Sequence, residues 1–174
     1  ITPDYDLDIM SAGQSLAELT ARVVTRVDEV VAAFEPDIVL VQGDTTTAMC
    51  GALAAFYRKV AVGHVEAGLR TGDKFAPFPE EVNRRLISQV ADLHFAPTER
   101  ARQSLIDSGV GASGVHLTGN TVVDALVWME RRVSHQPPAL AAALTADLEG
   151  RDLVMVTGHR RESLRQCDLD HGRG

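Results

Sequence analysis

Hydrophobic residues along this 174-residue chain follow two alternating patterns. Short continuous apolar runs of strand length are separated by longer segments in which apolar residues recur every three or four positions, the spacing of one helix face. Such alternation is typical of βαβ units that build a parallel sheet. The predicted strands cover 38–42, 60–65, 93–96, 115–118 and 153–157, and the predicted helices cover 16–34, 46–57, 80–91, 98–107 and 122–132.

The regular alternation breaks between residues 134 and 150, where two prolines precede an alanine-rich stretch. Residues 1–133 are expected to form most of one Rossmann-like domain without its first strand, because the first clear element is a helix. Residues 134–150 are expected to cross between domains. Residues 151–174 would begin a second domain that stops too soon to bury its own core. The predicted fold class is α/β with a doubly wound parallel sheet.

Composition narrows the classes of ligand. Hydrophobic residues make up 45% of the chain, enough to bury a core, and the formal net charge is −7. Nucleic-acid binding needs clustered basic residues, which this acidic balance argues against. Two cysteines encode neither a disulfide framework nor a cysteine-rich metal site, and no apolar run approaches the roughly 20 residues of a membrane span. We expect a cytoplasmic protein that binds a small molecule or a nucleotide.

Three acidic side chains stand where a parallel α/β domain places its chemistry. Asp44 follows the first predicted strand, Glu66 follows the second, and Glu80 begins the third predicted helix. Ligands of open parallel sheets bind in the crevice beyond the carboxyl ends of the strands. Asp44, Glu66 and Glu80 therefore form one candidate constellation.

Each of these acids also has an ordinary explanation. Asp44 could cap the helix that starts at Thr46. Alternation along an extended strand would put Glu66 on the same side as His64, as a structural pair in which His64 supports rather than catalyses. Glu80 and Glu81 stand four residues before Arg84 and Arg85, so both could form ion pairs on a solvated helix face.

A second candidate site follows the predicted strand at 153–157. Gly158, His159, Arg160 and Arg161 would stand at a strand-to-helix turn, where backbone amides and guanidinium groups favour an anion. The alternative is a basic helix start in a loose tail. Neither the Gly-x-Gly-x-x-Gly motif of dinucleotide-binding folds nor a P-loop motif occurs in the chain.

With these segments in one order and spacing, the chain resembles the non-hydrolysing UDP-N-acetylglucosamine 2-epimerases, which interconvert UDP-GlcNAc and UDP-ManNAc. Several uncommon motifs carry this resemblance: Gly43-Asp44-Thr45-Thr46-Thr47, Gly63-His64-Val65-Glu66-Ala67-Gly68-Leu69-Arg70, Pro79-Glu80-Glu81-Val82-Asn83-Arg84, Thr118-Gly119-Asn120-Thr121 and Thr157-Gly158-His159-Arg160-Arg161-Glu162.

The resemblance implies two Rossmann-like domains of the glycosyltransferase-B type, with the sugar nucleotide in the cleft between them. It implies Asp44, Glu66, Glu80 and His159 as catalytic residues, and it assigns substrate binding to Asp44, Glu66, His159 and Arg160. It also implies a homodimer for the full-length protein, a role in cell-envelope polysaccharide biosynthesis, and neither a nicotinamide cofactor nor a metal.

The chain departs from the family pattern at both ends. Family members begin with a strand and a Gly-Thr-Arg-Pro-Glu turn, and they continue after Ser163 with Phe-Gly-x-Gly, whereas residues 164–174 here differ. The chain is therefore expected to be an inactive fragment of an active parent. Two other functions stay open: a hydrolysing epimerase that releases UDP and ManNAc, and a non-catalytic module that binds a sugar nucleotide.

Overall fold

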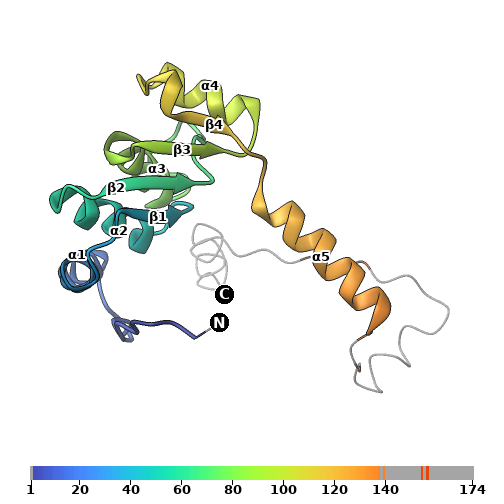
Figure 1. Cartoon of the computed structure of the whole chain (residues 1–174), viewed down its shortest axis with the longest axis horizontal. Coiled ribbons are helices and arrows are strands. Elements are labelled where there is room, and N and C mark those ends of the chain that lie inside the picture. Colours follow the sequence, from blue (N-terminus) through green and yellow to red (C-terminus); the bar gives the residue numbers. More distant parts are fainter. Residues whose placement is uncertain (1, 138, 140–153, 155, 157–174) are drawn as a thin grey trace, which may run out of the picture. The chain divides into compact units, whose positions relative to one another are not determined.

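The computed structural model describes residues 2–137, 139, 154 and 156. By its contacts the chain divides into two compact units, residues 1–120 and 121–174. The first unit contains, in order, α1 (Leu16–Phe34), β1 (Ile38–Gln42), α2 (Thr46–Tyr57), β2 (Ala61–Val65), α3 (Glu80–Val90), β3 (Leu93–Ala96), α4 (Glu99–Asp107), the 3-10 turn η1 (Ala112–Gly114) and β4 (Val115–Leu117) (Figure 1). The second unit contributes helix α5 (Thr121–His135).

The four strands form one parallel sheet in the order β1-β2-β3-β4. Each crossover moves one strand in the same direction, and right-handed crossovers of this kind place their helices on the same face. Buried residues agree with this rule. Val41 and Val62 pack with α2 and with Ile87 of α3, while Ala96 and Val115 pack with α4. The α/β fold class with a parallel sheet is confirmed.

Small side chains let α2 lie close to its neighbours. Ala52 and Ala55 are buried beside β1 and β2, where they form a core cluster with Val41 and Val62. Helix α1 packs against α2, and the buried Cys50 thiol lies 3.7 Å from the carbonyl oxygen of Thr20 across that contact. Burial raises the pKa of this thiol, so Cys50 acts as a small core residue.

The other face of the sheet is open within the described residues. Ile38 and Leu40 of β1 point to this face and are 40% and 63% exposed. Gly63 of β2 lies beside them, since a Cβ added there would meet the Leu40 and Phe95 side chains. A solvent-exposed apolar sheet face of this kind is unusual, because apolar strand residues normally pack against another layer.

The helix ends follow recognisable local chemistry. Ser15 and Glu18 form a reciprocal capping box at the start of α1. Thr45 and Thr98 cap α2 and α4 by accepting backbone N–H groups with their hydroxyls. The predicted helix and strand bounds are confirmed to within three residues for all nine predicted elements between residues 16 and 135. The strand predicted at 153–157 lies outside the continuously described residues.

Helix α5 is described by itself. It presents apolar side chains with high exposure, among them Leu126 and Trp128, and the Arg132 guanidinium lies over the Trp128 ring at 5.5 Å from its centroid. Among the helices that the structure describes, none combines the length and apolar composition needed to cross a bilayer.

Gly68 offers a test of how the loop after β2 packs on α4. Its φ is +89°, and an added Cβ would collide with the carbonyl group of Ala101. Gly109 has the same φ but open space around it. We predict that Gly68→Ala lowers the free energy of unfolding by about 3 kcal/mol, through backbone strain plus overlap, and Gly109→Ala by about 1 kcal/mol through strain alone. Urea unfolding of both variants measures the difference. Equal losses would mean that the loop does not press on α4.

Candidate active site

The carboxyl ends of β1 and β2 bring two of the predicted acids together. The Gly43 N–H donates to the Val65 carbonyl at 3.0 Å, which ties the two strand ends to each other. A Cβ placed on Gly43 would lie 3.8 Å from Oε2 of Glu66. The Glu66 carboxylate therefore lies beside the backbone that leads directly into Asp44.

Glu66 has an unusual backbone. Its φ is +65°, in the left-handed region that residues other than glycine rarely adopt. This conformation costs about 1 kcal/mol or more, and such strain tends to occur at functional positions. The side chain is half-buried, and within the described residues its carboxylate has no hydrogen bond or ion pair.

The expectation that His64 and Glu66 pair on one side of the strand is wrong. Strand β2 ends at Val65, and the left-handed turn at Glu66 interrupts the alternation on which that expectation rested. The buried His64 instead places Nε2 at 2.8 Å from the Gly43 carbonyl oxygen. Because a carbonyl only accepts, Nε2 carries the proton, and His64 supports the turn that presents Asp44.

The N-cap explanation for Asp44 is also wrong, because Thr45 caps α2. The Asp44 carboxylate instead forms an ion pair with Nη2 of Arg84, and its backbone carbonyl accepts a 2.9 Å hydrogen bond from the Asn83 side chain. Both partners come from α3 and are buried. The end of β1 and the first turns of α3 are therefore joined at Asp44.

The tandem glutamates at the start of α3 have different environments. Glu81 is fully buried and pairs with Arg85 at 2.7 Å, and it accepts the Thr71 backbone N–H at 3.1 Å. Burial raises the pKa of Glu81. The Thr71 amide and the neighbouring arginines lower it by more, so the pKa of Glu81 lies below the ordinary value. Glu81 therefore stays ionised.

Glu80 does not form the ion pair with Arg84 that its spacing predicts, because Arg84 is held by Asp44 and Glu81. Glu80 is half-buried, and its carboxylate has no hydrogen bond or ion pair among the described residues. Positions three and four residues apart share one helix face. Glu80 therefore lies on the face of α3 whose Asn83 and Arg84 contact Asp44.

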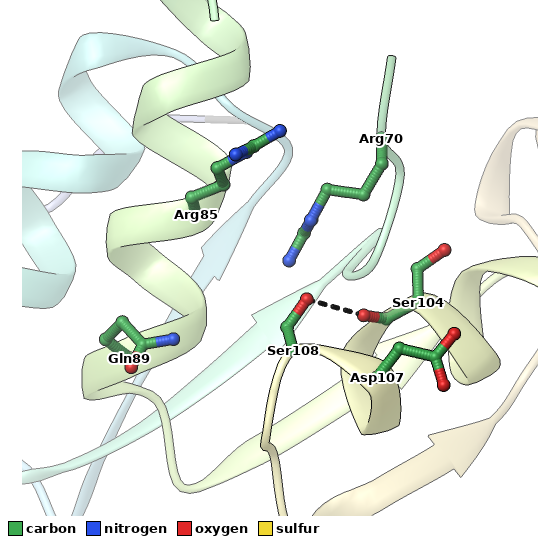
Figure 2. Close-up of a pocket in the computed structure, with 6 residues that line it drawn as sticks. All are labelled: Arg70, Arg85, Gln89, Ser104, Asp107 and Ser108. Atoms are coloured by element: carbon green, nitrogen blue, oxygen red, sulfur yellow. Dashed lines mark hydrogen bonds between the residues drawn. The ribbon is translucent and has the colours of Figure 1, made fainter. Parts of the chain in front are cut away.

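A groove of about 410 Å³ lies elsewhere, between the C-terminal halves of α3 and α4. Figure 2 shows Arg70 and Arg85 entering it from opposite sides, with Ser104, Asp107 and Ser108 along the α4 wall. Arg70 donates to the Ser88 hydroxyl at 3.0 Å, and burial lowers the pKa of its guanidinium. None of the three predicted acids lines this groove, so it is separate from their site.

Sequence reasoning did not find the partners of Asp44. Arg84 and Asn83 lie 40 and 39 residues further along the chain, and no local pattern reports a pair at that separation. His159 and Arg160, the predicted ligand-binding residues of the second domain, lie outside the described residues. Within those residues no cluster of His, Cys, Asp and Glu side chains is arranged to hold a metal ion.

The family model for UDP-N-acetylglucosamine 2-epimerase matches residues 1–170. The chain belongs to the UDP-N-acetylglucosamine 2-epimerase family. The UDP-N-acetylglucosamine 2-epimerases of Yersinia pestis and of Escherichia coli K12 are 51% and 50% identical to it over 166 and 167 residues. Each match covers 94% of this chain and 44% of the relative, so the chain spans less than half the length of these epimerases.

Solved structures of the epimerase family share the fold. A putative UDP-N-acetylglucosamine 2-epimerase from Listeria monocytogenes is 48% identical, with a TM-score of 0.83 over 94% of this chain and 42% of that one. The UDP-GlcNAc 2-epimerase from Neisseria meningitidis, solved with UDP-GlcNAc bound, is 48% identical with a TM-score of 0.73. That match covers 77% of this chain and 37% of the other.

The burial of His64 predicts a pH-dependent stability for this member of the epimerase family. Burial, as the main cause, lowers the pKa of His64 from 6.5 to about 4. Between these values the unfolded chain binds a proton that the folded chain does not, so stability falls as the pH drops. We predict a contribution of about 1.4 kcal/mol per pH unit between pH 6 and 5, measured by urea unfolding.

His64→Gln is the matched control, because it keeps an N–H donor for the Gly43 carbonyl and removes the titration. The lowered pKa of His94, which is also due mainly to burial, acts in the same direction and persists in the variant. The slope should therefore decrease by about one proton. Equal slopes for the two proteins would show that His64 titrates alike in the folded and unfolded states.

Proposed function

We propose that this chain supplies the acidic side of an active site that interconverts UDP-GlcNAc and UDP-ManNAc. The observation that carries the proposal is that the three candidate acids differ in whether they are paired with another side chain. Glu66 and Glu80 are half-buried, and their carboxylates have no protein partner in the described residues, whereas Asp44 is paired with Arg84. Unpaired carboxylates beside a paired one suit proton transfer next to a fixed negative charge.

The chemistry of the sugar explains the need for several carboxylates. The hydrogen on C2 is not acidic in the intact substrate, because the acetamido group gives little stabilisation to a carbanion. Cleavage of the C1–O bond leaves the bonding electrons on UDP and creates oxocarbenium character at C1, which acidifies C2 and is stabilised by nearby negative charge. A carboxylate then removes the C2 proton, and 2-acetamidoglucal and UDP are formed.

Inversion at C2 requires the proton to return on the opposite face while the UDP oxygen attacks C1 again. Two acid/base groups must therefore flank the ring. We assign proton transfer to Glu66 and Glu80, and we assign stabilisation of the developing positive charge to Asp44. The Asp44–Arg84 ion pair supports this division, because a carboxylate held by a guanidinium is fixed in place as a charge.

The proposal extends to the end of the chain, most of which lies outside the described residues. We propose that residues 134–150 cross between two domains, and that residues 151–174 begin the second one. His159 and Arg160 would then reach the UDP portion of the ligand from across the cleft, as cationic and polar donors suited to a diphosphate. The UDP-GlcNAc bound to the Neisseria meningitidis enzyme supports the substrate class.

The test uses a chimera in which the matching segment of this chain replaces that of the full-length Escherichia coli relative. We predict that Glu66→Gln and Glu80→Gln each lower kcat by about 10²–10⁴, because each keeps the side-chain shape and removes its basicity. Glu99→Gln, which removes an exposed ion-paired carboxylate, is the control and should keep normal turnover. Near-normal activity of either site variant would remove its acid/base role.

Turnover in heavy water identifies the reaction. Deuterium at C2 together with formation of UDP-ManNAc from UDP-GlcNAc supports the epimerase. Release of free ManNAc would identify a hydrolysing enzyme in which water replaces UDP as the nucleophile. Binding of UDP-GlcNAc without exchange in the unmutated chimera would favour a module that only binds the sugar nucleotide.

A further inference from the structure

The start of α3 contains a continuous chain of buried charges that leads to Asp44. Glu81 is 0% exposed and Arg84 is 8% exposed. Ionised side chains are costly to bury unless they are paired and hydrogen-bonded. Here each is: Arg84 contacts Asp44 and Glu81, and Glu81 contacts Arg85 as well.

Arg84 divides its two terminal nitrogens between two carboxylates. Nη2 pairs with Oδ2 of Asp44, and Nη1 lies 3.4 Å from Oε2 of Glu81. A guanidinium is planar and rigid, so fixing one nitrogen also fixes the direction of the other. The position of the Asp44 carboxylate therefore depends on where Glu81 holds Arg84.

Glu81 is itself held from two further directions. Its Oε1 accepts from Nε of Arg85 at 2.9 Å and forms an ion pair with Nη2 of Arg85 at 2.7 Å. Its Oε2 accepts from the Thr71 backbone N–H at 3.1 Å. Thr71 lies five residues after Glu66 in the same connecting segment. Glu81 thus joins the segment that follows Glu66 to the helix that holds Asp44.

We propose that Arg84 and Glu81 are positioning residues for the epimerase reaction, which hold the Asp44 carboxylate in the orientation it needs beside the sugar. This inference rests on the proposed role of Asp44 in catalysis. Both residues would act through Asp44, because Arg84 pairs directly with the Asp44 carboxylate and Glu81 pairs with Arg84. The tandem glutamates then have separate tasks: Glu80 is available to the substrate, and Glu81, buried and hydrogen-bonded on both oxygens, is committed to Arg84 and Thr71.

A purely structural role makes a different prediction. If Arg84 only stabilised the fold, its loss would lower the melting temperature and leave kcat of the folded enzyme unchanged. If Arg84 acts through Asp44, its loss lowers kcat with little change in KM, because the group that is displaced acts in the transition state. The two losses would also fail to combine, since residues that work as a unit are not additive.

The experiment is a double-mutant cycle in the chimera with the Escherichia coli relative, with kcat and KM measured for Asp44→Asn, Arg84→Gln and the double variant. We expect each single variant to lower kcat by about a hundredfold, the effect of a misplaced catalytic group. We expect the double variant to lose about the same hundredfold. A loss of about ten-thousandfold in the double variant, the product of independent effects, would overturn the inference.

Two further variants keep the test decisive if Arg84→Gln folds poorly. Arg84→Lys keeps the buried positive charge but has one nitrogen, which cannot orient against both carboxylates. It should melt close to the unmutated chimera and still lose kcat; normal kcat would overturn the inference. Arg58→Gln removes the remote ion pair with Asp28 and is the control, with unchanged kcat.

The same cycle separates this inference from the proposed function. Normal turnover of Asp44→Asn would refute the catalytic role of Asp44 and the positioning role with it. A strong loss in Asp44→Asn with normal kcat in Arg84→Gln would leave the proposed function intact and refute only the positioning role. Glu81→Gln should follow Arg84→Gln in direction, with a smaller loss of kcat, because Arg84 still contacts Asp44.

Discussion

The buried carboxylate of Glu81 is the constraint around which the candidate site is arranged. A buried negative charge must be surrounded by donors, and those donors come from the α3 helix and from the segment after β2. Arg84 pairs with Glu81 through one terminal nitrogen, and its other terminal nitrogen pairs with Asp44. The half-buried Asp44 carboxylate is thereby linked, through Arg84, to a fully buried charge.

The sheet supplies the second part of the arrangement. Parallel strands end at one edge, and the Gly43–Val65 hydrogen bond together with the His64–Gly43 contact locks the ends of β1 and β2 together. Small residues on α2 bring that helix close to the sheet, and α3 packs on both through Ile87. The backbone at Asp44 is therefore held by core packing as well as by its own hydrogen bonds.

Much of the fold could be predicted from periodicity, because each strand and helix buries one face and the spacing of its apolar residues reflects that burial. The placement of Asp44 and Glu66 at strand ends followed from the same reasoning. The individual contacts did not. The left-handed backbone at Glu66 interrupts the alternation from which its side-chain direction was predicted, and the Asp44–Arg84 pair joins residues 40 positions apart. Spacing also favoured an ion pair between Glu80 and Arg84. In the structure Arg84 pairs with Asp44 and Glu81 instead.

The left-handed conformation of Glu66 sets local stability against the need for a carboxylate at this position. A glycine or asparagine would adopt this backbone with less strain, so the stability of the fold alone would favour one of them over glutamate at position 66. A carboxylate retained there works against local stability, and the deficit must be balanced by packing elsewhere in the domain. In a relative that needs no carboxylate at this position, we expect glycine or asparagine in place of the glutamate on an unchanged sheet.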